Sequence, residues 1–342
     1  MVVLSERQGR LLRLVVEEYV ATGQPVGSKS LVERAGLGVS PSTVRHELSE
    51  LERFGLLTHP HTSAGRLPTE AGYRLYVDHL LASPEPRPGP FPLDLPRARA
   101  EVEEALQATT EVLSQVTRLL AIVSAPTNET ALVRRVEVLL LQPTMVMVVV
   151  ITSTGGVTKL RYTFPEAVDQ GLVTWAAEYL NERLTGVRLG SRAERVAFDE
   201  PALGARERAF LLVLRGAFAH APGEERRLFV GGAASLLDEM RTEEIGAYRS
   251  LMEALEKRAA LLDVLAQRLD PRRSFARVGE ELEQPGLREL ALVGATYGYA
   301  HQTLGAVSLL GPLRMDYEKA LHSVRSAAHE LSRFVEDVYG DD

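Results

Sequence analysis

Residues 40–57 read SPSTVRHELSELERFGLL, a stretch with the features of a helix that begins and ends at defined residues. Ser40 is a favoured N-cap, and Pro41 suits the first helical position, where a missing N–H removes no helical hydrogen bond. Gly55 is a stop signal directly after it. Apolar residues recur at helical spacing as Val44, Leu48 and Leu51. The sequence therefore predicts a helix over Pro41–Phe54 that buries one side.

The opposite side of this predicted helix is polar and suits contact with nucleic acid. Its residues are Ser42, Thr43, Arg45, His46, Ser49 and Arg53. A guanidinium such as that of Arg45 can bind O6 and N7 of guanine in the major groove, or it can bind a phosphate. Short hydroxyls reach phosphates or bases, and an imidazole donates or accepts according to its tautomer. These six side chains are candidate DNA contacts.

Two helices are predicted before this one. The first begins at Ser5, where Gln8 completes a capping-box pattern, and the second begins at Ser28 and is followed by a glycine-containing turn over residues 36–38. Ser28 and Lys29 join the candidate contacts. Two helices, a glycine turn and a polar third helix are typical of a helix-turn-helix. The periodicity alone fits a helical bundle with a solvated polar face equally well.

A β-hairpin is predicted directly after the third helix. Strands over Leu56–His59 and Arg66–Pro68 flank a tip that contains Thr62 and Ser63, and a fourth helix follows from Thr69. A hairpin in this place is a wing. With the third helix in the major groove, Arg66 and the two hydroxyls are expected to follow the DNA backbone.

Composition fits a protein of two or three domains without pointing to DNA. The 342 residues carry a formal net charge of −7 and no cysteine, which excludes disulfides and thiolate chemistry. Residues 1–80 hold nine basic and nine acidic residues, so the acidic balance comes from the rest of the chain. Only a docking face must be positive for DNA binding. The charged N-terminus does not resemble a signal peptide, and the apolar stretch 136–152 is too short and interrupted to span a membrane, so a cytoplasmic protein is expected.

A proline-rich stretch divides the chain. Residues 83–96 read SPEPRPGPFPLDLP, where six prolines preclude both helix and central strand and indicate a linker. After it, a helix is predicted over 98–124, strands over 131–141, 145–152 and 157–164, and a helix over 167–184. Further strands over 289–296 and 303–310 and a helix over 316–339 end the chain. This pattern predicts an α+β domain, interrupted by a mainly helical segment over 200–271.

The helical segment carries an apolar seam. Its residues follow spacings of three and four: Ile245, Tyr248, Met252, Leu255, Ala259, Leu262, Ala266 and Leu269. Seams of this kind pack helix against helix. The seam is expected to join two copies of the chain, although burial against its own domain is the alternative.

Several motifs resemble one family of bacterial regulators. They are TGQPVGSKS at 22–30, SPSTVRHELSELERFGLL at 40–57, HPHTSAGRLPTEAGYRLYVDHLL at 59–81 and, more weakly, LVGATYGYAHQTLGAVSLLGPLRMDYEKAL at 292–321. Together they resemble the HrcA family of heat-inducible repressors of chaperone operons. The family commonly carries Asn where this chain has His46, a departure at one candidate contact. The long proline-rich linker is also unusual for the family.

The resemblance implies an arrangement and a function. It implies an α+β multidomain protein with a winged helix-turn-helix over 1–82, a linker over 83–96, a GAF-like domain over 97–199 and 272–342, and an inserted dimerisation domain over 200–271. It further implies a homodimer bound to double-stranded DNA at an inverted-repeat operator, the CIRCE element. Repression would be lost on heat shock, and the chaperonin GroE would maintain the repressor.

Other functional classes receive less support from the residues. The chain has no phosphate-binding G-x-x-x-x-G-K-[ST] loop, no H-E-x-x-H and no G-x-S-x-G, so neither an enzyme nor a cofactor is expected. His59 and His61 weakly resemble a metal pair without an evident third ligand, so no metal is expected. The alternative is a regulator controlled by a small molecule in the GAF-like domain, lined by Thr296–Thr303.

Overall fold

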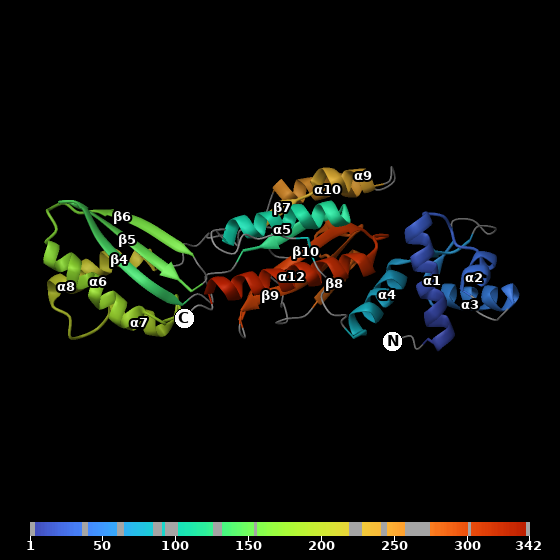
Figure 1. Ribbon diagram of the computed structural model, residues 1–342, viewed down its shortest axis with the longest axis horizontal. Helices are drawn as coiled ribbons and strands as arrows, with labels where there is room; N and C mark the ends of the chain where they lie inside the picture. The colour runs from blue at the N-terminus through green and yellow to red at the C-terminus, as the bar shows by residue number, and fades with distance from the viewer. Residues whose placement is uncertain are drawn as a thin grey trace.

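The chain folds as a mixed α+β protein whose parts lie in a row (Figure 1). The computed structural model describes residues 4–35, 40–59, 65–84, 91–92, 102–125, 132–153, 156–218, 228–240, 245–256, 274–299 and 302–339. An N-terminal unit of helices lies at one end, a five-stranded sheet with its helices lies in the middle, and a three-stranded sheet with its own helices lies at the other end.

The N-terminal unit contains the predicted helices and hairpin. Its elements are α1 Glu6–Thr22, α2 Ser28–Ala35, α3 Pro41–Arg53, β1 Leu57–Thr58, β2 Leu67–Pro68 and α4 Glu70–Ala82. The predicted caps are confirmed: Ser5 and Gln8 form a capping box, Ser40 caps α3 and Thr69 caps α4. The predicted stripe of α3 is buried, with Val44 and Leu51 fully covered and Leu48 nearly so.

A five-stranded antiparallel sheet forms the middle of the molecule. Its strand order is β7-β3-β10-β9-β8, with bounds β7 Leu228–Gly231, β3 Leu120–Ser124, β10 Gln302–Pro312, β9 Leu290–Tyr299 and β8 Ser274–Val278. Helices α5 Val102–Thr117 and α12 Tyr317–Tyr339 pack side by side on the sheet. Every β9 residue from Leu290 to Tyr297 is buried, so both faces of this strand are covered.

The second sheet is separate and has its own core. Strands β4 Val133–Gln142, β5 Met145–Thr152 and β6 Val157–Thr163 pair antiparallel with one another only. Helices α6 Gln170–Leu184, α7 Arg192–Phe198 and α8 Ala205–Leu214, with the short η2 Arg215–Ala217, supply the rest of the unit. Its buried residues, such as Val148 and Leu180, form a cluster distinct from the main core. We call this part, residues 132–218, the inserted unit.

The boundary of this insertion differs from the predicted one. The sequence pattern predicted an insertion over 200–271, mainly helical. In the structure the separate unit is 132–218, whereas β7, α9 Ala233–Glu239 and α10 Ile245–Glu256 belong to the central core, to which they contribute Leu236 and Leu251. The reason is that alternating apolar residues identify a strand but not the sheet that it joins.

The predicted helix over 98–124 also ends earlier than expected. Helix α5 stops at Thr117, Arg118 adopts a φ of 58°, and Leu120–Ser124 forms strand β3 between β7 and β10. All five β3 residues are buried. A short apolar run of this kind is ambiguous between helix and strand, because both of its faces are covered.

The predicted apolar seam is only partly described. Leu262 and Leu269, with Ala259 and Ala266, lie outside the described residues, as does the side chain of Leu255. Tyr248 and Met252 pack against the central core of the same chain, and Ile245 is 45% exposed. Two of the three seam side chains that the structure describes therefore turn toward their own domain.

The N-terminal unit packs directly on the central part through α4. The buried rings of Tyr73 and Tyr76 lie 5.9 and 6.3 Å from the ring of Tyr317, the first residue of α12. The Tyr317 hydroxyl donates to the Leu313 carbonyl at 2.7 Å, and burial raises the pKa of this phenol well above its usual value. The two parts share one hydrophobic cluster, although most of the proline-rich stretch between them lies outside the described residues.

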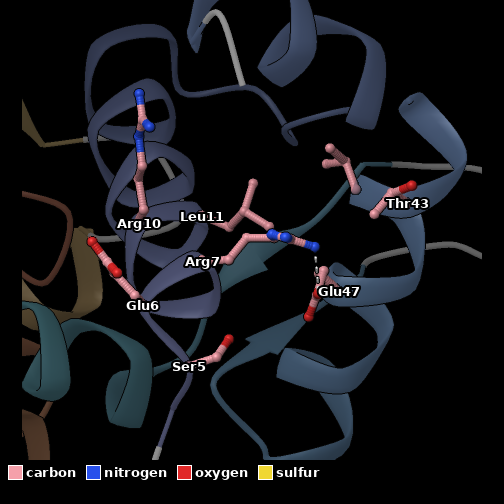
Figure 2. Close-up of a pocket in the computed structure, with 8 residues that line it drawn as sticks. Ser5, Glu6, Arg7, Arg10, Leu11, Thr43 and Glu47 are labelled. Atoms are coloured by element: carbon pink, nitrogen blue, oxygen red, sulfur yellow. Dashed lines mark ion pairs between the residues drawn. The ribbon is translucent and has the colours of Figure 1, made fainter. Parts of the chain in front are cut away.

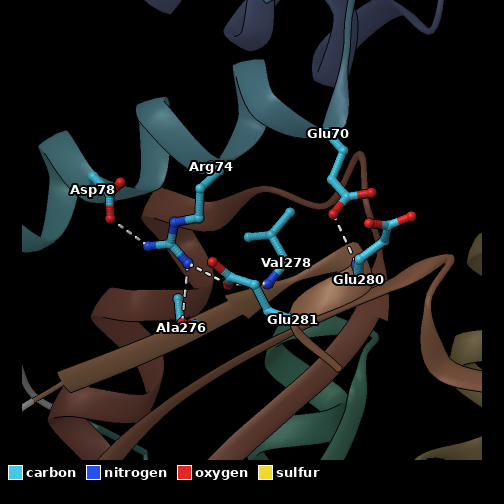
Figure 3. Close-up of polar contacts among 7 residues, drawn as sticks. All are labelled: Glu70, Arg74, Asp78, Ala276, Val278, Glu280 and Glu281. Atoms are coloured by element: carbon cyan, nitrogen blue, oxygen red, sulfur yellow. Dashed lines mark hydrogen bonds and ion pairs between the residues drawn. The ribbon is translucent and has the colours of Figure 1, made fainter. Parts of the chain in front are cut away.

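Polar contacts border this aromatic contact (Figure 3). The Arg74 guanidinium donates to the Ala276 carbonyl at 3.1 Å, to the Glu281 carboxylate at 2.9 Å and to Asp78 at 2.6 Å. The Glu280 amide donates to Glu70 at 2.8 Å. Residue 279 is glycine, with a φ of 59°, and a Cβ there would lie 2.1 Å from the Glu70 carboxyl carbon. These contacts fix the orientation of α4 on the central sheet.

Replacing Arg74 tests this contact. Arg74→Ala should lower the free energy of unfolding by about 1.5–3 kcal/mol, because a partly buried guanidinium loses its charge-assisted hydrogen bonds across the contact. Asp78→Ala is the matched control, because Asp78 is 57% exposed and its hydrogen bond, within the described part of the chain, is to Arg74 of the same helix. It should cost less than about 1 kcal/mol. Equal urea midpoints for the two variants would show that Arg74 does not hold the parts together.

Candidate nucleic-acid interface

Helix α3 presents a polar face beside its buried stripe. Ser40 Oγ accepts the Thr43 amide at 3.2 Å, which fixes the first turn. The exposed residues of the helix include most of the predicted contacts: Ser42, Arg45, His46, Ser49 and Arg53. The Ser49 hydroxyl donates to the Arg45 carbonyl at 3.0 Å, so its hydrogen is directed to the helix. Arg53 is 71% exposed and pairs with Glu50 at 2.8 Å.

A hollow of about 570 Å³ lies between α3 and the first turns of α1 (Figure 2). Glu47 of α3 borders it with a side chain only 16% exposed. Arg7 approaches this carboxylate to 3.6 Å, and Nε2 of the Gln8 side chain donates to it at 3.1 Å. Arg7 thus offsets the negative charge of Glu47, and Gln8 satisfies one of its oxygens with a hydrogen bond. The sequence reasoning named Gln8 only as a helix cap and missed its contact, and that of Arg7, with Glu47, because these contacts join positions about forty residues apart.

The base of the hairpin lies at the C-terminal end of α3. Strands β1 and β2 pair through Leu57↔Pro68 and Thr58↔Leu67. Arg66, predicted to follow the DNA backbone, directs its guanidinium to Glu52 at 2.8 Å and is 19% exposed. Of the predicted contacts at the tip, Thr62 and Ser63 lie outside the described residues.

The remaining predicted contacts lie at the start of α2. Ser28 begins the helix and is half-buried, whereas Lys29 is exposed. Helix α2 packs against α3. The structure thus brings Lys29 and the exposed residues of α3 onto one compact helical unit.

The other chemistries that the sequence raised concern a metal pair and a ligand cup. In the described ranges, no three His, Asp or Glu side chains gather as a metal site, and no helix has the length and apolar character of a membrane span. Tyr297, expected to line a ligand cup, is buried and donates to the Ser124 carbonyl at 2.7 Å. Residue 305 is glycine, and a Cβ there would meet the Tyr297 ring at 2.7 Å. The sheet is filled by protein at this position.

Comparison with known proteins identifies relatives over nearly the whole chain. A family model described as HrcA protein C-terminal domain matches residues 103–321. The heat-inducible transcription repressor HrcA of Acidothermus cellulolyticus is 34% identical, over 97% of this chain and 99% of its own length. The protein of the same name from a Nocardioides species is 37% identical, over 97% of this chain and 99% of its own.

A solved structure shares the fold. It is a protein described only as hypothetical, 21% identical, which matches 97% of this chain and 99% of its own length with a TM-score of 0.62. The sequence comparisons go further than the fold, because both relatives carry the same name and align almost end to end. This chain belongs to the HrcA family of heat-inducible transcription repressors, a family of regulators without enzymatic activity.

Proposed function

We propose that the chain represses chaperone operons by binding an inverted-repeat operator, the CIRCE element, through the N-terminal unit. In this proposal the unit is a winged helix-turn-helix, with α3 in the major groove and the β1–β2 hairpin as the wing. The observation that carries the proposal is the exposed polar face of α3, on a helix whose first turn is fixed by Ser40 and whose opposite face is buried.

Arg45 is the proposed principal base contact, because it is exposed near the start of α3. Arg45→Ala should weaken operator binding by about 1–3 kcal/mol and relax specificity at one base pair, as loss of a bidentate guanine contact would. Footprinting and fluorescence anisotropy on a chaperone promoter measure both effects. Arg134→Ala, an exposed arginine of β4 in the inserted unit, is the control and should leave binding unchanged. An unaltered footprint for Arg45→Ala would remove the assignment.

A two-fold symmetric operator requires a two-fold symmetric protein, so we propose a homodimer. Two surfaces are candidates. One is the apolar seam that begins in α10. The other is the face of the three-stranded sheet opposite its core, where Leu139 pairs with Met147 and Ile151 pairs with Val157.

The sheet face has the stronger support. Leu139 is 42% exposed and Val157 is 51% exposed, whereas Met147 and Ile151 are half-buried and belong to neither core. An exposed apolar patch of this kind marks an interaction surface. Tyr248 and Met252 of the seam, by contrast, already pack on their own domain.

We further propose that the central domain is GAF-like.

Charged substitutions separate the two surfaces. Leu139→Glu with Met147→Glu should give monomers by light scattering, because two carboxylates would be desolvated in the contact. The matched pair Leu255→Glu with Leu262→Glu, in the seam, should leave a dimer. Monomers should bind the full operator far more weakly, because the second half-site no longer adds its effective concentration. The opposite pattern of masses would assign the dimer contact to the seam.

Regulation by heat completes the proposal. Because a domain is stabilised by only about 5–15 kcal/mol, a modest temperature rise can change its folded fraction many-fold. The shared core of the N-terminal unit and the central sheet supports coupling between loss of packing and release of DNA. Operator binding should therefore fall on heating and recover with added chaperonin and ATP. Anisotropy of a labelled operator measures this, and indifference to both treatments would refute the heat mechanism.

A further inference from the structure

Glu52 joins the third helix to the hairpin that follows it. It lies in the last turn of α3, and its two carboxylate oxygens have different partners. Oε2 pairs with the Arg66 guanidinium at 2.8 Å, next to β2, and Oε1 contacts the His59 imidazole, which follows β1. One carboxylate therefore contacts residues beside both strands, at the end of the pairing nearest the hairpin tip. The three side chains are 26%, 19% and 35% exposed, in the order Glu52, Arg66 and His59.

The backbone of Arg66 is fixed from the other side. Its amide donates to the Val26 carbonyl at 2.8 Å, and the Val26 amide donates to the Arg66 carbonyl at 2.9 Å. Residue 65 is glycine, and a Cβ there would lie 2.6 Å from the Pro25 and Val26 backbone. Close approach of two backbones is the reason that glycine is required at this position. Arg66 is thus held between the α1–α2 connection and the end of α3.

The hairpin needs such support. Among the residues that the structure describes, β1 and β2 pair at two positions, and isolated two-stranded hairpins are marginally stable at best. The pairing alone does not fix the angle between the hairpin and α3. Glu52 supplies a second attachment, because it belongs to α3 and contacts residues beside both strands.

We infer that Glu52 and Arg66 form a positioning pair that aligns the wing with the recognition helix, and that Arg66 does not neutralise a DNA phosphate. This inference rests on the proposed function. An arginine that turned to the DNA would leave Oε2 of Glu52 without its guanidinium partner, close to the phosphates, with the contact to His59 at Oε1 remaining. The observed pair instead satisfies an acidic group near the DNA and fixes the direction from which the wing approaches.

Salt dependence distinguishes positioning from phosphate contact. The slope of log K against log salt is negative, and loss of one phosphate contact reduces its magnitude by about 0.9. Arg66→Ala should weaken operator binding roughly threefold or more while leaving this slope unchanged, because no counterion-releasing contact is lost. Arg53 also pairs with a glutamate, Glu50, but its side chain is 71% exposed rather than 19%, so it remains free to reach a phosphate. Arg53→Ala removes the same charge in the same turn as Glu52 and should reduce the magnitude of the slope by about 0.9. If Arg66→Ala reduced the magnitude of the slope as much as Arg53→Ala does, the inference would be overturned.

For Glu52→Gln, the loss of charge and the loss of positioning predict changes in DNA affinity of opposite sign. The variant removes a negative charge near the DNA and keeps the shape, so charge alone would raise affinity. The positioning role predicts lower affinity, again roughly threefold or more. Arg66→Lys, which retains a charged donor, should recover most of the affinity lost in Arg66→Ala. Equal or higher affinity for Glu52→Gln contradicts the inference.

Hydrogen exchange without DNA separates this inference from the proposed function. In Glu52→Gln the amides of Thr58 and Leu67, in β1 and β2, should exchange faster, whereas the amides of the buried strand β9 should not change. Unchanged exchange at Thr58 and Leu67 overturns the positioning role whatever the DNA result. Absence of operator binding by the unaltered chain, with accelerated exchange in the variant, would instead reject the proposed function and retain the positioning pair.

Discussion

The packing of α4 on the central sheet is the contact on which the arrangement of the molecule depends. Helix α4 belongs to the N-terminal unit, yet Tyr73 and Tyr76 are buried against Tyr317 at the start of α12. Arg74 adds hydrogen bonds to the β8 segment and to Glu281. Helix α4 therefore packs against both the N-terminal unit and the central part. The orientation of α3 relative to the central sheet depends on this packing of α4.

Two of the motifs that suggested the family are structural partners. The loop with Pro25 and Val26 pairs with the backbone of Arg66, and Gly65 permits the close approach. The guanidinium of Arg66 then turns to Glu52 in a third motif. The backbone positions of residues 25–26 and 65–66, about forty residues apart, therefore depend on each other. Some residues of a motif that resembles a set of DNA contacts can therefore serve to position the other residues that contact DNA.

The inserted unit presents a different physical problem. One face of its sheet covers a core that includes Val148 and Leu180, whereas the other carries Leu139 and Val157 exposed to solvent. A sheet with one uncovered apolar face gains stability when that face is buried. Because this unit has a core of its own, such a contact can form without rearranging the central sheet.

Local features were predictable from the sequence, and tertiary ones were not. Caps such as Ser5, Ser40 and Thr69 and the stripe of α3 act within one or two turns, so the sequence determined these helices and the polar face that they expose. It also identified the strands over 133–152. Only the tertiary structure decided that these strands form a sheet separate from β3, that 120–124 is a strand, and that Arg66 faces Glu52. The reason is that strand pairing and side-chain partners depend on residues distant in sequence, whose approach no local period records.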